Sequence, residues 1–470
     1  MGAAPFVICN FEFVIVMLTY DLKKSPGVPL YEALYRCIRS DILSGILPPG
    51  AKLPSKRALA LNLEVSKITV EAAYAQLLAE GYIRSREKVG YFVEAVERHA
   101  VPPITPAPAP AETAPLLDLT GSAPRQFPFP VWSRLLREVM LDYGENLLLQ
   151  SPNTGIPALR AAIAEHLSAF RGMQVDESCI LIGAGTDFLY NLLIQLLGRD
   201  KCYAVEEPGY GKIRRIYAAA GATCVSAALD ENGVRPESLK NAQVLHCSPN
   251  HHFPLGLVTP VGRRLELLRW AEEGNRYIIE DDYDCEFRFD AHPMPSLQSL
   301  DHSGRVIYMN TFSKSLAPSI RISYMVLPRP LMEKFQKELG FYSSTVPSFE
   351  QHTLARFLSR GYFEKHINRL RRSYKGLRNR VIGLLENCPL ADKFTIEERD
   401  AGLHFLLRVQ TDLSDEALCA RCAEAGIRVY PLSHYYHSPV PAAGRHCLVI
   451  NYAGLSEEDV ALLEEKLRDI

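Results

Sequence analysis

The chain has 470 residues, of which 47% are hydrophobic and 23% charged, and its formal net charge is -2. This length can bury large cores and is typical of two or three domains. The near-zero charge excludes nucleic-acid binding through an overall basic excess, so any such function must lie in a local region.

Eleven cysteines, an odd number without framework spacing, favour a reducing cytoplasmic location over a secreted disulfide scaffold. The first sixteen residues, MGAAPFVICNFEFVIV, are apolar, but no Lys or Arg precedes the apolar run and Glu12 interrupts it. No small-residue cleavage site follows, so we expect no export. We interpret residues 1–16 as a non-native extension before a natural start at Met17. No other stretch approaches the about 20 apolar residues of a membrane span.

Residues 29–96 predict three helices followed by two short strands. PLYEALYRCIRSDILS, at 29–44, repeats apolar residues three and four apart, which is typical of an amphipathic helix, and Gly45 ends it. SKRALALNL and SKITVEAAYAQLLAEG each begin with a serine that can cap a helix, and a short turn separates them. YIRSR and YFVEAV then alternate as the strands of a hairpin. This pattern favours a winged helix-turn-helix within residues 17–96.

The side chains placed to contact double-stranded DNA lie at the starts of the second and third helices and on the hairpin. Phosphate contacts would position such a domain, and base-edge contacts would specify its sequence. The alternative is a generic three-helix subdomain whose charges are solvated. The candidate DNA-binding residues are Ser55, Arg57, Ser66, Lys67, Thr69 and Lys88.

The same residues carry a resemblance to a known family. IRSDILSGILPPGAKLPSKRALALNLEVSKITVEAAYAQLLAEGYI is similar to the winged helix of the GntR class of bacterial regulators, notably in PPG-x-x-LPS-x-R-x-LA and in its LxxEGYI exit. The resemblance implies a DNA-binding domain.

A proline-rich segment at 97–116, which contains VPPITPAPAPAETAPL, predicts an extended linker. In residues 117–470 short apolar strands alternate with longer helices, which is typical of an α/β domain with a mainly parallel sheet. The length exceeds what one sheet needs. We therefore expect a small C-terminal α/β lobe after the long basic helix at 362–386.

The stretch YMNTFSKSLAPSIRISYMV places Lys314 just after an apolar strand and seven residues before Arg321. A lysine in an apolar pocket can lose its proton and form a Schiff base with an aldehyde. Nearby hydroxyls and the arginine can hold a phosphate on that aldehyde. The implied cofactor is pyridoxal 5'-phosphate (PLP); the alternative is a surface lysine in a serine-rich loop.

Other strand ends supply groups that PLP would need. The turn at Gly185 and Thr186 opens a helix, whose N–H groups suit a phosphate. Asp281, after the strand RYIIE, could pair with the pyridine nitrogen, and Tyr283 could bond the phenolic oxygen. The alternatives for DDYD are a solvated acidic turn or a metal site, but no histidine or carboxylate at ligand spacing accompanies it, so no metal is expected.

Two further loops have a place in the same site. Tyr210 follows the strand YAVEE and could stack on the ring, and His251, in SPNHHFPLG, could reach the cofactor. A plain polar loop is the alternative for either histidine of that segment. Agreement among four strand-end loops of one α/β domain favours a single cofactor site.

The region from about Asp118 to Ile470 resembles a fold-type I aminotransferase, with GxPxLR at 155–160, EDDYD and SK-x-x-x-P-x-x-R among its marks. Joined to a GntR winged helix, it resembles the MocR group of regulators, and LIGAGTDFLYNLLIQLLGRDKCYAVEEPGYGK is most similar to the PdxR branch, which controls PLP synthesis or salvage genes. The resemblance implies that Lys314 forms the internal aldimine, with Asp281, Tyr283 and Tyr210 around the ring. It assigns the phosphate to Thr311, Ser313, Arg321, Gly185 and Thr186.

Four positions depart from the aminotransferase pattern. Val449 stands where an arginine would grip an amino acid's carboxylate, a bidentate contact that valine cannot make. Phe253 replaces the usual asparagine, Gln150 the tyrosine of a dimer partner, and Asp187 a neutral residue near the phosphate. These departures argue against efficient transamination and leave aldehyde capture intact.

We therefore expect a cytoplasmic, homodimeric regulator that binds DNA half-sites and senses PLP at Lys314. The alternative is an active PLP-dependent aminotransferase that carries a DNA-binding module. A third possibility is an amino-acid effector captured on PLP that is already bound, which Val449 weakens.

Overall fold

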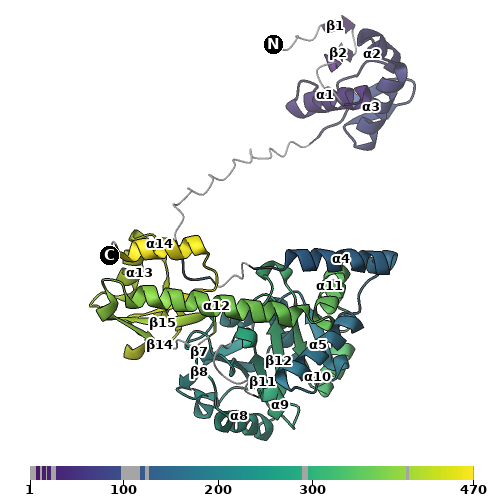
Figure 1. Ribbon diagram of the computed structural model, residues 1–470. Coiled ribbons are helices and arrows are strands. Elements are labelled where there is room, and N and C mark those ends of the chain that lie inside the picture. The colour runs from purple at the N-terminus through teal and green to yellow at the C-terminus, as the bar shows by residue number, and fades with distance from the viewer. Residues whose placement is uncertain are drawn as a thin grey trace. The chain divides into compact units, whose positions relative to one another are not determined.

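The computed structural model describes residues 7–10, 13–16, 18–22, 28–96, 117–121, 126–287, 295–397 and 402–468. The chain divides into two compact units, Met1–Ala111 and Glu112–Ile470 (Figure 1). The predicted linker at 97–116 lies outside the described residues. Among the described residues, no helix combines the length and the apolar character that crossing a membrane requires.

The first unit contains the three predicted helices and the predicted hairpin. These are α1 (Leu30–Ser44), α2 (Lys56–Asn62), α3 (Lys67–Ala79), β3 (Ile83–Arg86) and β4 (Gly90–Val93), with β3 and β4 antiparallel. Helix α1 buries Leu34 and Ile38 against α3, and it ends at Gly45, whose φ of 81° is left-handed. Strands β1 (Val7–Asn10) and β2 (Phe13–Val16) also pair, within the segment interpreted as an extension.

The second unit is built on an eight-stranded sheet. Its order is β6 (Ile180–Gly183), β13 (Ser323–Val326), β12 (Val306–Thr311), β11 (Tyr277–Asp281), β10 (Val244–Cys247), β7 (Cys202–Glu207), β8 (Thr223–Asp230) and β9 (Gly233–Val234). All neighbours are parallel except those that involve β13 or β9. The mainly parallel sheet predicted from the alternating pattern is confirmed.

Helices cover both faces of this sheet. Alternate residues of one strand therefore enter different cores: Ile180 and Ile182 belong to one apolar cluster and Leu181 to another. The helices of this part of the unit are α5 (Pro157–Arg171), α6 (Thr186–Leu197), α7 (Gly211–Ala219), α8 (Val261–Glu273), α9 (Leu297–Leu300), α10 (Arg329–Glu338) and α11 (Ser348–Ser359), and α4 (Phe129–Tyr143) packs against α11.

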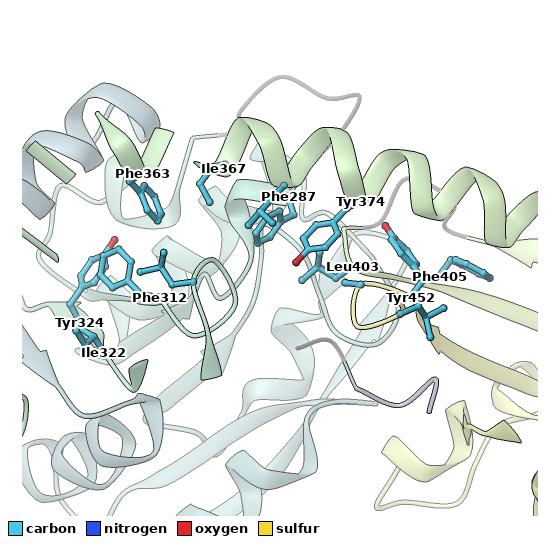
Figure 2. Packing of buried hydrophobic residues seen from close by; sticks show 14 of the residues in the cluster. Phe287, Phe312, Ile322, Tyr324, Phe363, Ile367, Tyr374, Leu403, Phe405 and Tyr452 are labelled. Carbon is cyan, nitrogen blue, oxygen red and sulfur yellow. The ribbon is translucent and has the colours of Figure 1, made fainter. Parts of the chain in front are cut away.

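The predicted C-terminal lobe follows α12 (Tyr362–Glu386), the predicted long helix. Its strands pair in the order β14 (Phe394–Glu397), β15 (His404–Val409), β18 (Cys447–Asn451) and β17 (Tyr430–Pro431), with helices α13 (Asp415–Glu424) and α14 (Glu457–Arg468). Strand β16 (Ile427–Arg428) pairs with β5 (Leu117–Asp118). In Figure 2, α12 passes over a row of buried side chains that runs from Phe312 and Phe363 to Phe405 and Tyr452. One apolar core therefore joins the lobe to the large sheet.

Parallel strands place their carboxyl ends at one edge of a sheet, and this edge carries the predicted cofactor residues. Strands β6, β7, β10, β11 and β12 all end there. Asp281 is the last residue of β11, and the loops that follow the other strands hold Gly185, Tyr210, His251 and Lys314. Strand β13 is antiparallel, so Arg321 lies before its first residue, beside the end of β6.

Candidate functional site

Asp281 ends β11 and is buried, with 5% of its surface exposed. Its Oδ2 accepts a hydrogen bond from the Tyr190 hydroxyl and lies 3.3 Å from Nε2 of His246. Its Oδ1 is buried and has no hydrogen-bond partner among the described residues. Leaving a buried carboxylate oxygen without a donor is costly, so this atom is suited to accept a hydrogen bond from a ligand.

A second layer of polar side chains supports Asp281. Nδ1 of His246 lies 2.6 Å from the Tyr217 hydroxyl. If that hydroxyl donates to Nδ1, the ring proton sits on Nε2 and faces Asp281. Tyr190, Tyr217 and His246 come from α6, α7 and β10, and none of the three was among the predicted site residues. They occupy ordinary core positions, so no local signal marks them.

Lys314 follows the end of β12 by three residues and is half-buried. In the parallel pairing of β11 with β12, Asp281 lies opposite Met309, so the strand ends that carry Asp281 and Lys314 are neighbours. Burial lowers the pKa of Lys314, and the Asp284 carboxylate opposes that shift. The lowered pKa increases the fraction of neutral amine, which is the nucleophilic form.

The acidic turn after β11 is buried, so the interpretation of DDYD as a solvated turn is wrong. Asp282 accepts a hydrogen bond from the Tyr308 hydroxyl at 2.7 Å, and its Oδ2 lies 3.0 Å from Nη2 of Arg171. Asp282 and Asp284 are each 2% exposed, and Asp284 contacts the loop that holds His251. Asp282 therefore fixes the turn to the core, and Asp284 connects the turn to the loop that carries His251. Among the described residues, no group of His, Cys, Asp and Glu could hold a metal ion.

His251 and His252 are both buried, so the loop that carries them is not an exposed polar loop. The C-terminal lobe covers it: a Cβ at Gly402 would lie 2.4 Å from Cε1 of His251. Its Nδ1 lies 2.6 Å from Oδ2 of Asp284, and its Nε2 has no partner among the described residues. Burial raises the pKa of Tyr283 well above its usual range, so the hydroxyl keeps its proton. Tyr283, whose hydroxyl is 3.4 Å from Nδ1 of His251, can thus donate to a ligand oxygen.

Arg321 reaches the turn between β6 and α6. Its Nη2 lies 3.3 Å from the carbonyl oxygen of Ala184 and 3.4 Å from Oδ2 of Asp187. Gly185 has a φ of 91°, and a Cβ there would lie 2.3 Å from Nη2 of Arg321. The missing side chain thus makes room for the guanidinium. The site at this end combines a half-exposed arginine with the N-terminus of a twelve-residue helix, an arrangement suited to an anion.

The remaining predicted cofactor residues, Thr311, Ser313, Thr186 and Tyr210, differ in their burial and in their contacts. The Thr311 hydroxyl is buried, accepts hydrogen bonds from the Ser313 N–H at 3.1 Å and the Ser323 hydroxyl at 2.8 Å, and so shapes the turn before Lys314. Ser313 is half-buried, and Thr186 is the first residue of α6. Tyr210 is 51% exposed at the start of α7, edge-on to Phe253.

In the first unit, two of the predicted DNA-binding serines are helix caps. Ser55 Oγ accepts from the N–H of Ala58, and Ser66 Oγ accepts from the N–H of Thr69, each at 3.1 Å. Ser66 Oγ also lies 2.8 Å from Thr69 Oγ1. Both serines are exposed, and so are the charged side chains Arg57, Lys67 and Lys88. Ile68, which was not among the predicted DNA-binding residues, is 77% exposed in the first turn of α3.

Comparison with known proteins agrees with this two-unit organisation. Residues 30–93 match the family of bacterial regulatory proteins of the gntR type, and residues 114–467 match aminotransferases of class I and II. The probable rhizopine catabolism regulatory protein MocR of Rhizobium meliloti is 35% identical over 92% of this chain and 92% of its own length. The chain belongs to the MocR group of GntR regulators. It is thus a transcriptional regulator with an aminotransferase-like domain.

Other members of the MocR group are similar along most of their length. An HTH-type transcriptional regulator of Bacillus subtilis, YhdI, is 38% identical over 96% of this chain and 97% of its own. The pyridoxine biosynthesis regulator PdxR of Corynebacterium glutamicum is 31% identical over 85% of this chain and 87% of its own. PdxR is therefore one of several similar branches. The kynurenine aminotransferase structure of Pyrococcus horikoshii has a TM-score of 0.65 and 25% identity, over 76% of this chain and 91% of that chain.

Aminotransferase folds of this class normally bind PLP, and the residues of this MocR-group chain fit that group. The buried Oδ1 of Asp281, which has no partner among the described residues, could accept a hydrogen bond from a protonated pyridine nitrogen. Tyr283 supplies a hydroxyl donor, and the side chain missing at Gly185 leaves space beside Arg321. When bound, PLP supplies an aldehyde that a lysine amine can capture.

Proposed function

We propose that this regulator binds PLP covalently at Lys314 and that PLP changes its affinity for promoter DNA. The genes it controls would be those of vitamin B6 synthesis or salvage. Binding would favour one arrangement of a homodimer, in which the two winged helices either match or fail to match their half-sites.

The observation that carries this proposal is the buried Oδ1 of Asp281. Tyr190 and His246 hold Oδ2 of the same carboxylate, so the side chain is fixed while one oxygen stays available. A carboxylate held in this way keeps a pyridine ring protonated, which strengthens binding of the ring. The position of Asp281 beside the strand end of Lys314 fits one ligand that joins both residues.

The small lobe favours sensing over catalysis. Val449 is fully buried in an apolar cluster with Leu406 and Tyr435, and Phe253 packs on that cluster. An amino-acid carboxylate next to these side chains would lose its water without gaining a guanidinium. The assignment to vitamin B6 genes has separate support, because one relative is named as a regulator of pyridoxine biosynthesis.

Replacing Lys314 with alanine tests the covalent step. We expect PLP to change the promoter affinity of the unaltered chain by about tenfold, which corresponds to a coupling free energy of about 1.4 kcal/mol, and to leave that of K314A unchanged. Footprints and binding curves on DNA upstream of its own gene and of vitamin B6 genes, with and without PLP, provide the measurement. Lys337→Ala, at an exposed position of α10, is the matched control. A K314A variant that keeps the full response would disprove capture by this lysine.

An active aminotransferase is the second candidate, supported by the fold that the chain shares with such enzymes. Mixing the PLP-loaded protein with a panel of amino acids separates the two functions. Sustained release of keto acid would favour the enzyme. A spectrum that the amino acids leave unchanged, together with a DNA response to PLP alone, would favour the sensor.

A further inference from the structure

Asp187 lies in the first turn of α6, beside the residues proposed to hold the PLP phosphate. Its Oδ2 is 2.7 Å from Nζ of Lys212 and 3.4 Å from Nη2 of Arg321. Lys212 belongs to α7, and Arg321 precedes β13, so two cations from separate elements meet at one carboxylate oxygen. All three side chains are between one-third and one-half exposed.

This contact affects how strongly an anion can bind. Arg321 is the guanidinium closest to the turn at Gly185, and in the structure Asp187 and the Ala184 carbonyl already accept from it. A phosphate at the start of α6 must share Arg321 with a carboxylate or displace that carboxylate. Together, Asp187, Lys212 and Arg321 carry a net charge of one positive unit, which only partly balances a phosphate dianion.

We propose that Asp187 competes with the cofactor phosphate for Arg321, and that Lys212 holds the carboxylate when the phosphate displaces it. Asp187 is then a residue that sets both the affinity for PLP and the preference for PLP over pyridoxal, which lacks the phosphate. The inference rests on the proposed function, because it requires PLP as the ligand.

The geometry gives each residue a distinct part. The contact of Asp187 with Lys212 is the shorter of the two, so the carboxylate keeps a cationic partner after Arg321 turns to the phosphate. Of its two cationic contacts, Asp187 therefore gives up only the longer one in this exchange. A weaker affinity suits a regulator, because a protein that binds PLP too tightly stays saturated and cannot respond to changes in the PLP concentration.

Asp187→Asn in the full-length chain provides the test. Dissociation constants for PLP and for pyridoxal are measured from ligand absorbance, in a low-salt buffer free of inorganic phosphate, since salt screens such half-exposed charges. We expect D187N to lower the dissociation constant for PLP about tenfold and to leave that for pyridoxal nearly unchanged. Asp412→Asn, which removes one exposed negative charge from the C-terminal lobe, should change neither constant.

A second variant separates the two parts of the proposal. Lys212→Gln should weaken PLP binding in the unaltered background, because Asp187 then has only Arg321 as a partner. In the D187N background the same change should have a much smaller effect, since Lys212 no longer has a carboxylate to hold. An equal effect in both backgrounds would mean that Lys212 contacts the phosphate directly and would overturn its assigned part.

The outcomes distinguish this inference from the proposed function. Unchanged or weaker PLP binding by D187N, or an equal change for pyridoxal, overturns the competition while PLP binding itself stands. A wild-type chain that binds neither PLP nor pyridoxal overturns the proposed function and this inference together. Thermal unfolding of each variant, compared with D412N, separates a loss of binding from a loss of folding.

Discussion

At the scale of single residues, the carboxyl edge of the large sheet holds one acid, Glu206, that burial keeps mainly protonated at neutral pH. Glu206, near the end of β7, has its pKa raised to about 8, mainly by burial, with a further contribution from the Asp281 charge. The N–H of Ser248 donates to its Oε2 at 3.0 Å and opposes the shift. At neutral pH the folded chain therefore holds a proton at Glu206 that the unfolded chain, with a pKa of about 4.5, has released.

Glu206→Gln should make stability less sensitive to pH. The stability linked to this proton is fully present below about pH 4.5 and is lost as pH rises through about 8. Between about pH 6 and about pH 9, the cofactor-free wild type should lose about 2 kcal/mol more than E206Q. Thermal unfolding midpoints across this range measure the difference, with the exposed Glu272→Gln as control. Parallel pH profiles for E206Q and wild type would contradict the prediction.

The same scale shows which site residues sequence can reveal. Lys314, Asp281 and Arg321 each lie within a few residues of a short apolar strand, so the strand pattern itself places them at the edge of the sheet. Tyr190 and His246 lie inside ordinary apolar elements and reach Asp281 only through strand and helix packing. That contact depends on tertiary register, which a local pattern does not contain.

At the scale of elements, the turn between β6 and α6 is a sterically constrained part of the proposed site. Gly185→Ala would strain a backbone with a φ of 91° and would place a Cβ 2.3 Å from Arg321. We expect a loss of about 1 kcal/mol in stability from the backbone. We also expect a loss of at least about tenfold in PLP affinity because the guanidinium must move. Denaturation and ligand titration measure the two effects.

Gly172→Ala is the matched control for that turn. Gly172 ends α5 with a φ of 64°, and a Cβ there would meet no atom within 4 Å. G172A should therefore lose similar stability and keep its PLP affinity. Equal losses of affinity in both variants would show that general destabilisation, and not the space beside Arg321, governs binding.

Helix periodicity and capping predicted the three helices of the first unit and the long helix α12 with bounds close to those observed, as the cap at Ser66 shows. The strand order was not predictable, because β6 pairs with β13 more than a hundred residues later in the chain. This pairing brings Gly183 opposite Ser323 and so places Arg321 at the turn of Gly185. The phosphate end of the proposed site is a product of that long-range register.

At the scale of the whole molecule, the second unit exposes apolar side chains that a monomer would leave in water. Leu141 is 78% exposed, Leu148 76% and Leu149 68%, whereas Leu147 between them is buried. Leu141 lies near the end of α4, Leu148 is the last residue of the short helix that follows, and Leu149 comes directly after that helix. Large apolar side chains that are exposed in one chain are often buried at subunit interfaces, and we propose that these leucines lie within the homodimer contact.

Replacing both Leu148 and Leu149 with aspartate should therefore give a monomer. Burying two carboxylates in an apolar interface is costly, so light scattering after gel filtration should report half the wild-type mass. DNA with two half-sites should lose at least about tenfold in affinity, because one chain can no longer present two winged helices, whereas a single half-site should bind as before. Leu413→Asp, at an exposed position of the C-terminal lobe, should remain dimeric.

A double variant that keeps its mass would place the dimer contact elsewhere. One that becomes monomeric and still binds both half-sites tightly would separate dimerisation from DNA recognition.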